Sequence, residues 1–237
     1  MNYIYKKWLN GHSLNVLVCG ETGSGKSITG LALLLTLSKL RGIPVNLKKS
    51  LYMDLEKFML GFYTSKRNIY ILDEAKIHLS SKKWWSDFNT YFGNILATQR
   101  YRENIYIIIL PLAKTLAKEH RDMIDVIIEM KGKGWASCYI VMRRWSEIKK
   151  FELWRFYVGD LAIKLPEKKY VEEYESIGEQ KKEEIYLNMA AEVLGKRRCF
   201  CGYPINYLDT ECKACGFRWS QKHIYQLIEN KLGAMSR

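Results

Sequence analysis

The segment from Gly20 to Ser27, Gly-Glu-Thr-Gly-Ser-Gly-Lys-Ser, has the G-x-x-x-x-G-K-[ST] spacing of a phosphate-binding loop. Small residues let the backbone N–H groups of such a loop close round a phosphate. Lys26 is expected to reach the β- and γ-phosphates of a nucleotide, and the Ser27 hydroxyl to ligate Mg²⁺ at the start of a helix predicted from Ile28 to Leu40. An apolar run, residues 15–19, precedes the loop and disfavours the alternative, an ordinary glycine-rich turn. The predicted ATP-binding residues of the loop are Gly20, Glu21, Thr22, Gly23, Ser24, Gly25, Lys26, Ser27 and Ile28.

A second apolar run, residues 68–72, ends in two adjacent carboxylates, Asp73 and Glu74. In P-loop NTPases the Asp at such a strand end holds Mg²⁺. The Glu that follows is positioned to polarise an attacking water, which suits hydrolysis better than transfer to a second substrate. We therefore predict an ATPase in which Asp73 is the metal residue and Glu74 the general base. The alternative is a strand followed by a solvated acidic turn.

Four cysteines form two short pairs near the end of the sequence, Cys199 with Cys201 and Cys212 with Cys215. A glycine follows each pair, and glycine lets backbone N–H groups turn toward thiolates, as in the paired knuckles of a structural zinc site. The first pair is one residue shorter than the common C-x-x-C. We predict a Cys₄ zinc site, structural because the thiolates leave no open position; disulfides are the alternative.

The chain of 237 residues has a net charge of +13 and is 48% hydrophobic, enough for a core of ordinary size. The basic excess favours an anionic partner besides ATP, most simply nucleic acid; a solvated basic surface is the alternative. Trp84 and Trp85 follow two lysines and could stack on bases, or simply pack at a helix start. No run approaches the roughly 18 apolar residues of a membrane span, and the start lacks a signal-peptide apolar region. We expect a cytoplasmic protein with no membrane span.

The chain divides by composition into three parts. Residues 1–165 are predicted to be the P-loop ATPase domain, residues 166–195 an acidic helical connector, and residues 196–237 a zinc-ribbon-like module with a C-terminal helix. Alternating strands and helices predict an α/β fold, a RecA-like P-loop NTPase with a mainly parallel sheet flanked by helices. In the first part we expect, after the loop and its helix, strands at 44–47, 68–72, 105–110 and 136–141 and helices near 52–63 and 84–96.

Taken together, these motifs resemble the FtsK–HerA group of P-loop motors, and look closest to the compact branch that holds the archaeal viral and plasmid ATPases and the Zot-like proteins of filamentous phages. The resemblance covers the region from about residue 11 to 165 and rests on the loop, the acidic strand end, Thr98–Arg102, Ile105–Leu110 and His120–Asp122. It implies a homo-oligomeric ring, expected to be hexameric, that hydrolyses ATP to move DNA in packaging, export or conjugative transfer. If the chain is viral or plasmid-encoded, its location is the host cytoplasm.

The resemblance also implies that an arginine from a neighbouring subunit completes each ATP site. Arg100, Arg102 and Arg121 flank the strand 105–110 and are the candidates for this role. Each of them has the alternative of plain surface charge. Arg121 is the preferred candidate.

The chain departs from the family at the end of that strand, where a polar residue, commonly Gln, reads the γ-phosphate. Leu110-Pro111-Leu112 stands there instead, and Gln99 lies upstream. Lys114 or Thr115 are candidate substitutes.

Two other classes of function compete with the motor. One is a nucleotide-switched adaptor or assembly ATPase of a secretion or replication complex, and the other is a small-molecule kinase, disfavoured because no Arg-rich lid is evident. Turnover stimulated by DNA favours the motor, tight binding with little turnover the adaptor, and a phosphorylated product the kinase.

Overall fold

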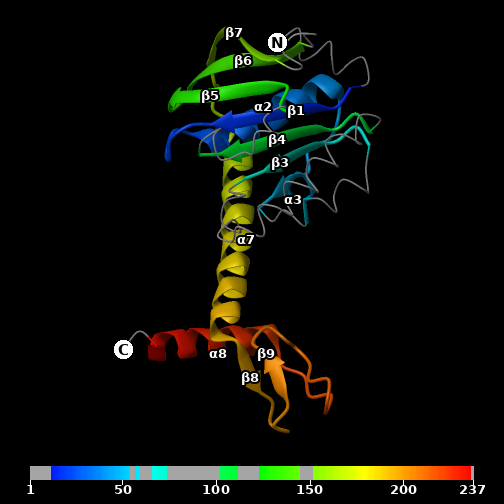
Figure 1. Ribbon diagram of the computed structural model, residues 1–237, viewed down its shortest axis with the longest axis vertical. Coiled ribbons are helices and arrows are strands. Elements are labelled where there is room, and N and C mark those ends of the chain that lie inside the picture. Colours follow the sequence, from blue (N-terminus) through cyan, green and yellow to red (C-terminus); the bar gives the residue numbers. More distant parts are fainter. Residues whose placement is uncertain are drawn as a thin grey trace. The chain divides into compact units, whose positions relative to one another are not determined.

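The structure, a computed structural model, describes residues 12–53, 57–58, 66–73, 102–111, 123–144 and 152–235. The chain forms two compact units, Met1–Ile177 and Gly178–Arg237. The first unit contains a large sheet, which Figure 1 shows, and the second contains a cluster of four cysteines. Within the described ranges, no helix has the length and apolar character needed to cross a membrane.

The first unit is built on a seven-stranded sheet with the order β2-β3-β4-β1-β5-β6-β7. Neighbouring strands from β2 to β5 run parallel, while β6 and β7 continue the sheet antiparallel. The prediction of an α/β fold with a mainly parallel sheet is confirmed. The strands are β1 (Leu14–Cys19), β2 (Leu51–Tyr52), β3 (Ile69–Leu72), β4 (Ile105–Leu110), β5 (Val126–Gly132), β6 (Trp135–Arg144) and β7 (Glu152–Ala162).

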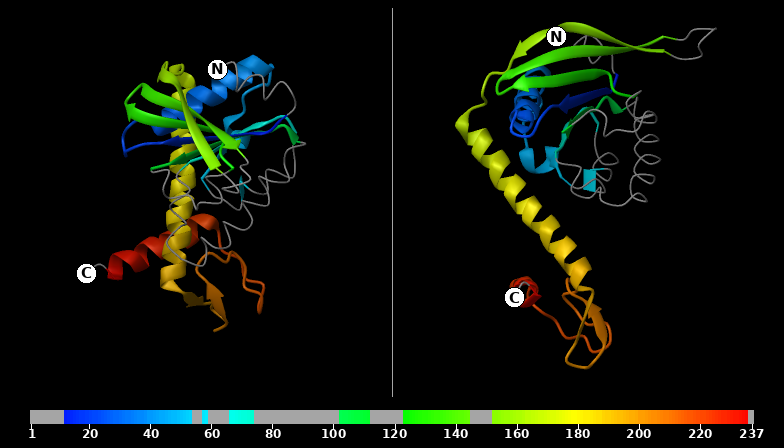
Figure 2. Two further views of the ribbon diagram at one scale, coloured as in Figure 1. Left: turned by 45° about the horizontal axis from the view of Figure 1, so that its top comes forward. Right: turned by 60° about the vertical axis from the view of Figure 1, so that its left-hand side comes forward.

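The central strands are apolar along their whole length because both of their faces are buried. In β1, for example, Val16 and Val18 belong to one core, whereas Leu17 and Cys19 belong to the core on the opposite face. Helix α2 (Lys26–Arg41) fills the first core through buried leucines, and Figure 2 shows this helix lying against the sheet. Because these buried strands are held rigidly side by side, the loop after β1 and Asp73 after β3 lie at the same edge of the sheet.

Helix α7 (Lys168–Leu194) begins in the first unit and ends in the second. Its first turns pack into the same core as α2, with Tyr174 and Ile177 buried there and Tyr170 and Val171 packed against it. Residues that the sequence assigned to a connector therefore contribute to the core of the sheet.

Several predicted elements need correction. The strand predicted at 44–47 is wrong: Asn46 caps a short helix, α3 (Leu47–Ser50), by accepting a hydrogen bond from the Lys49 N–H, and the strand is β2 instead. Leu51 and Tyr52 are extended, so the next helix does not begin at Tyr52; residues 57–58 are helical. Strands β5 and β7 were not predicted. The helix expected near 84–96 lies outside the described residues.

The second unit contains a two-stranded antiparallel sheet and a helix. The strands β8 (Lys196–Arg198) and β9 (Pro204–Asn206) precede helix α8 (Gln221–Met235). Its small core joins α8, two of the cysteines and the end of α7, through Ala191 and Leu194. Helical spacing on α7 places Ile185, Met189 and Val193 on one face, but only Ile185 is buried, whereas Met189 and Val193 are exposed.

Candidate nucleotide site and cysteine cluster

The topology brings the predicted loop and the acidic strand end to one edge of the sheet. The loop follows β1, Asp73 follows β3 and Pro111 follows β4, and these three strands are parallel. Because β4 lies between the other two strands, the loop and Asp73 stand about 10 Å apart, two strand spacings. The N–H of Gly20 donates to the carbonyl of Pro111 over 3.1 Å, which ties the loop to the end of β4.

The loop turns sharply and tightly against β5. Gly20 has a φ of 152°, and a Cβ atom at this position would lie 2.7 Å from the Cβ of Met130. The Nζ atom of Lys26 donates to the carbonyls of Gly20 and Glu21 over 3.0 and 2.7 Å. The lysine amine is therefore held at the loop by weak, replaceable acceptors, and a phosphate could take their place.

The start of α2 offers hydrogen-bond donors without side-chain partners. Gly25, with a φ of 91°, is the N-cap of the helix, and no side chain in the described part of the chain caps it. The Oγ atom of Ser24 is buried and has no hydrogen-bond partner among the described residues. Uncapped N–H groups at a helix start, beside a lysine and a buried hydroxyl, are a favourable setting for an anion. A nucleotide phosphate fits these residues.

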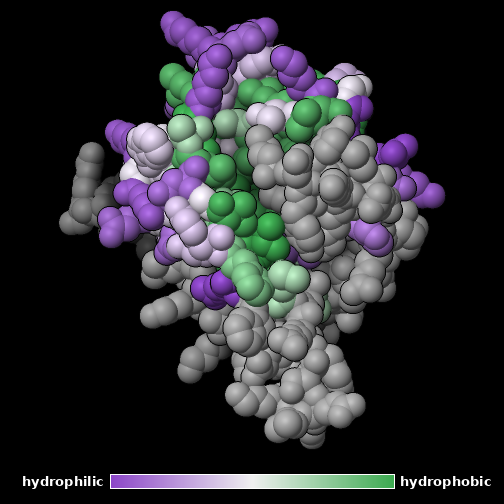
Figure 3. Space-filling model, turned by 90° about the horizontal axis from the view of Figure 1, so that it is seen from above, coloured by the Kyte–Doolittle hydropathy of each residue, from purple (hydrophilic) through white to green (hydrophobic). Residues whose placement is uncertain are grey.

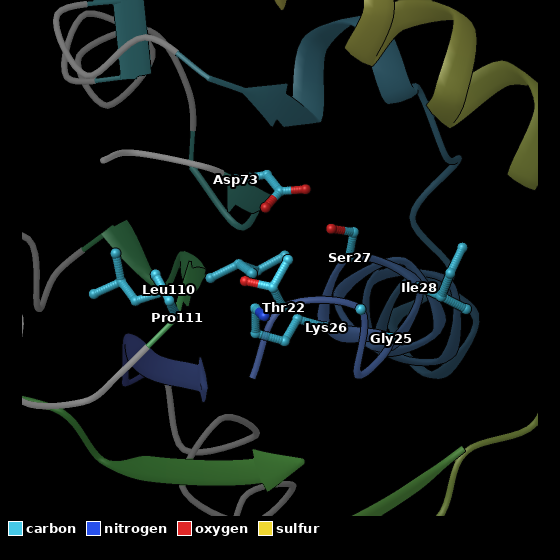
Figure 4. A pocket seen from close by; sticks show the side chains of 10 residues that line it. Thr22, Gly25, Lys26, Ser27, Ile28, Asp73, Leu110 and Pro111 are labelled. Atoms are coloured by element: carbon cyan, nitrogen blue, oxygen red, sulfur yellow. The ribbon is translucent and has the colours of Figure 1, made fainter. Parts of the chain in front are cut away.

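A pocket of about 420 Å³ opens between the loop, Asp73 and the end of β4. Figure 4 shows the Asp73 carboxylate and the Ser27 hydroxyl facing one another across it. Asp73 is 2% exposed, and its Oδ2 accepts a hydrogen bond of 2.7 Å from the hydroxyl of Tyr174, which is also buried. A carboxylate and a hydroxyl that converge from opposite sides of a pocket are oxygen ligands suited to Mg²⁺. The pocket is lined by Thr22, Gly23, Gly25, Lys26, Ser27, Ile28, Asp73, Ile109, Leu110 and Pro111.

A second hollow, of about 360 Å³, shares Gly25 and Ile28 with the first. Ile163 and Leu165, from the segment after β7, line it together with Lys133 of the turn between β5 and β6. Apolar walls beside a phosphate site suit the flat base of a nucleotide.

The structure brings together part of the predicted site. The loop residues and Asp73 meet at the pocket, whereas Glu74, Arg100 and Arg121 lie outside the described residues, as do Trp84 and Trp85. Arg102 precedes β4, at the opposite end of that strand from Pro111. It is therefore not close to the loop of its own chain, so as an ATP-site residue it could act only toward a neighbouring chain; plain surface charge is the alternative.

Two residues at the site were not predicted. Met130, on β5, contacts the loop and accepts a hydrogen bond of 3.3 Å from the Thr29 hydroxyl to its sulfur. Tyr174 belongs to the stripe Tyr170, Tyr174 and Ile177, which the sequence shows as an apolar helical face. That pattern identifies a packing face, but the contact with Asp73, 101 residues away, is a product of the tertiary structure.

The four cysteines of the second unit form one cluster. Their Sγ atoms all lie within 4.8 Å of one another, with 3.5 Å between those of Cys199 and Cys215 and 3.7 Å between those of Cys201 and Cys212. Four thiolates at about 2.3 Å from a tetrahedral zinc are about 3.8 Å apart. The cluster thus has the dimensions of a metal site.

Each cysteine pair sits in a similar backbone turn. The N–H of Gly202 donates to the Cys199 carbonyl over 2.8 Å, and the N–H of Gly216 donates to the Cys212 carbonyl over 2.7 Å. The first turn is one residue tighter, which accounts for the short spacing of its cysteines. Both glycines have positive φ, 83° and 72°, a conformation that residues with a Cβ rarely adopt.

The surroundings of the cluster shift the pKa values of its thiols in opposite directions. Desolvation acts to raise the pKa of Cys212, but the N–H groups of Cys215 and Ala214 lower it to about 7. The Phe217 N–H acts to lower the pKa of Cys215, but the neighbouring Cys199 and Cys201 thiols raise it to about 12. A divalent cation would offset the cost of gathering such thiolates.

Comparison with known proteins gives no assignment. No protein-family model matches the chain, and no curated protein matches it.

Proposed function

We propose that this protein is an ATPase of the RecA-like P-loop type that moves DNA as a ring of subunits. The observation that carries the proposal is the pocket in which the loop, Lys26 and Asp73 meet at the carboxyl ends of parallel strands. Phosphates bind at this edge in α/β folds, and the uncapped start of α2 adds donors for them.

In this proposal each residue of the site has a separate task. The loop N–H groups and Lys26 bind the phosphate chain, and the second hollow, with Ile28 and Leu165, receives the base. Ser27 and Asp73 would hold Mg²⁺, which, when bound, neutralises charge on the phosphates. Tyr174 orients the Asp73 carboxylate. Glu74, the next residue along the chain, accepts a proton from the attacking water.

The antiparallel edge of the sheet supports the proposal of a ring. Phe156, Tyr157 and Val158 of the edge strand β7 are 47%, 58% and 48% exposed, and Trp135 and Met142 of β6 are also exposed. Figure 3, which looks down on the side where β6 and β7 lie in Figure 1, shows hydrophobic residues gathered in a band. Exposed apolar surface on an edge strand favours contact with another chain. We propose this edge as a subunit interface.

The cysteine cluster completes the proposal as a structural zinc site. Four thiolate ligands leave no position open for a substrate, so the metal would stabilise the second unit rather than take part in hydrolysis. The small core of that unit needs such support, because a module of this size buries little apolar surface.

The experiment that tests the proposal measures ATP hydrolysis by the full chain with Mg²⁺, alone and with single-stranded DNA, duplex DNA or RNA. A rate that rises several-fold with DNA supports the motor. Tight ATP binding with a slow rate that no nucleic acid changes would favour the nucleotide-switched adaptor, and a phosphorylated small molecule would favour a kinase. Lys26→Ala controls for contaminating ATPases, since it removes the charge at the phosphates.

A further inference from the structure

The second unit has a pocket of its own, of about 420 Å³, that the proposed ATPase does not use. It lies between the first cysteine turn and α8, and none of its lining residues is acidic. The lining residues that matter for its chemistry are cationic or aromatic: Arg197, Arg198, Phe200, Trp219, His223 and Lys231. The pocket therefore combines positive charge with aromatic faces.

Phe200 is the most exposed large apolar residue of the described chain, at 84%. It stands between Cys199 and Cys201, so the cysteine turn holds its backbone. Its ring is stacked on that of Trp219, with centroids 6.4 Å apart and planes 23° apart, and forms a T-shaped pair with the ring of Phe217, with centroids 5.3 Å apart. One side of the Phe200 ring is thus supported by aromatic neighbours, while most of the side chain faces solvent. Exposing such a ring costs stability, which a ligand stacked on it would restore.

Arg197 is fixed beside this aromatic group. Its guanidinium lies 4.2 Å from the centre of the Trp219 ring, and one Nη atom donates to the Asp209 carbonyl over 2.8 Å. Its Nε atom is buried and has no hydrogen-bond partner in the described part of the chain. A pre-positioned guanidinium that lines the pocket is suited to a phosphate oxygen. Arg198 and Lys231 add exposed charges at the same pocket.

The charge of the whole module agrees with an anionic partner. Residues 196–237 contain eight Lys and Arg against three Asp and Glu. A zinc ion with four thiolates would subtract a net charge of about two and leave the module positive.

We propose that this pocket binds single-stranded nucleic acid, with a base stacked on Phe200 and the adjoining phosphates on Arg197, Arg198 and Lys231. Stacking separates this partner from the other polyanions: a duplex keeps its base faces covered, and an acidic peptide has no flat group for the ring. The inference shares with the proposed function the choice of nucleic acid as partner, but it needs neither ATP nor hydrolysis.

The test measures binding of fluorescent oligonucleotides to the full chain by anisotropy, without ATP. The probes are a thymidine 20-mer, a uridine 20-mer, a hairpin duplex and polyphosphate, which has the charge but no bases. Phe200→Ala should weaken binding of the 20-mers by about 5- to 100-fold, the range expected for one lost stacking contact. Polyphosphate affinity should change less than about twofold, because the cations are unchanged. The two 20-mers distinguish DNA from RNA.

Matched variants control for charge and folding. Lys231→Ala should weaken all single-stranded and polyphosphate probes, whereas Lys222→Ala, on the same helix but outside the pocket, should have less effect. Phe200→Trp should keep affinity, because it keeps a stacking face. Phe200→Leu removes the aromatic ring but keeps an apolar side chain, so it separates loss of stacking from loss of apolar contact. Retained zinc content shows that the module of each variant is folded.

Because the whole chain has a net charge of +13, a second readout locates the contact on the chain. A 20-mer carrying 5-iodouracil should crosslink to the tryptic peptide 199–213, and Phe200→Ala should abolish that crosslink. Unchanged 20-mer affinity in Phe200→Ala together with crosslinks only elsewhere would overturn the inference. Equal loss of polyphosphate and 20-mer binding would also overturn it, because charge alone would then explain the site. The double variant Lys26→Ala/Phe200→Ala should bind the oligonucleotides as Phe200→Ala alone does. Binding at this pocket can therefore be judged independently of whether the chain hydrolyses ATP.

Discussion

The hydroxyl of Tyr174 donates a hydrogen bond of 2.7 Å to the Oδ2 atom of Asp73, and both side chains are buried. Tyr174 belongs to helix α7, which continues beyond the first unit toward the cysteine module. The carboxylate proposed to hold Mg²⁺ is thus oriented by the helix that leads to the second unit.

We predict that Tyr174→Phe raises the Mg²⁺ concentration needed for half-maximal ATP hydrolysis by about 10- to 150-fold, the equivalent of one hydrogen bond to a charged group. Binding of ATP without Mg²⁺ should change little, because the loop is untouched. Tyr170→Phe, one turn earlier on the same helix, makes the same chemical change as a control. An unchanged Mg²⁺ dependence in Tyr174→Phe would remove the positioning role.

In the proposed mechanism Lys26 serves ATP binding and Glu74 serves hydrolysis, so changing them should have different effects. Lys26→Ala should weaken ATP binding itself, because the charge that faces the phosphates is lost. Glu74→Gln should bind ATP with near wild-type affinity but lower the hydrolysis rate by about 10²-fold or more, since the amide cannot accept a proton. Binding is measured with a fluorescent ATP analogue and turnover by phosphate release. Hydrolysis by Glu74→Gln at the wild-type rate would show that another group is the base.

The cysteine cluster should hold one zinc ion per chain. Cys199→Ser should release the metal and unfold the module from about residue 196 onward, because zinc binding supplies much of its folding free energy. Elemental analysis measures the metal, and limited proteolysis measures the unfolding. Lys213→Ser, between the second pair of cysteines, should keep the zinc.

The cluster should also retain less zinc as the pH is lowered. The thiols must lose their protons to bind the metal, so acid competes with zinc for the same atoms. The pKa of Cys212, lowered to about 7, makes this thiol the easiest of the perturbed ones to keep ionised, whereas Cys215, with its pKa raised to about 12, depends most on the cation. Carefully purified protein that contains no zinc at neutral pH would contradict the site.

The edge of the sheet should mediate assembly. Phe156→Asp places a charge on the exposed apolar strand β7. It should raise the dissociation constant of the assembly at least about tenfold and so favour single chains. Leu40→Asp makes the same change at an exposed position of α2 and serves as the control. Sedimentation velocity gives the size of each species. A wild-type protein that is monomeric at all concentrations would exclude the ring.

An arginine supplied across that ring would make hydrolysis depend on two chains. Arg121→Ala should keep ATP affinity and lower turnover by about 10³-fold, the contribution of a guanidinium that reaches the transferred phosphoryl group in trans. Mixing this variant with Lys26→Ala should restore part of the activity, since some interfaces would combine an intact loop with an intact arginine. No recovery on mixing two stable, co-assembled variants would argue that Arg121 acts within its own chain or not at all.

The sequence by itself determined the local features of the two sites. The spacing from Gly20 to Ser27 fixes a tight loop after a buried strand, and the glycines after the cysteine pairs fix two similar turns. These features depend on backbone conformation and on neighbouring residues, so they can be predicted without knowing the rest of the chain. The apolar strand Ile105–Leu110 was predicted with its observed bounds, because burial on both faces leaves an uninterrupted apolar run.

Only the tertiary structure determined which distant residues meet. The order of β3, β4 and β1 places Asp73 opposite Ser27, and it places Arg102 at the far end of β4 from the loop. The sequence predicted a helical connector but did not single out Tyr174, and an apolar helical pattern could not name Asp73 as its partner, since the same pattern suits any apolar surface. The pocket beside Phe200 likewise needs the first cysteine turn and α8 together. Strand pairing and helix packing join residues far apart in the chain, and the pattern within each segment carries no record of those pairings.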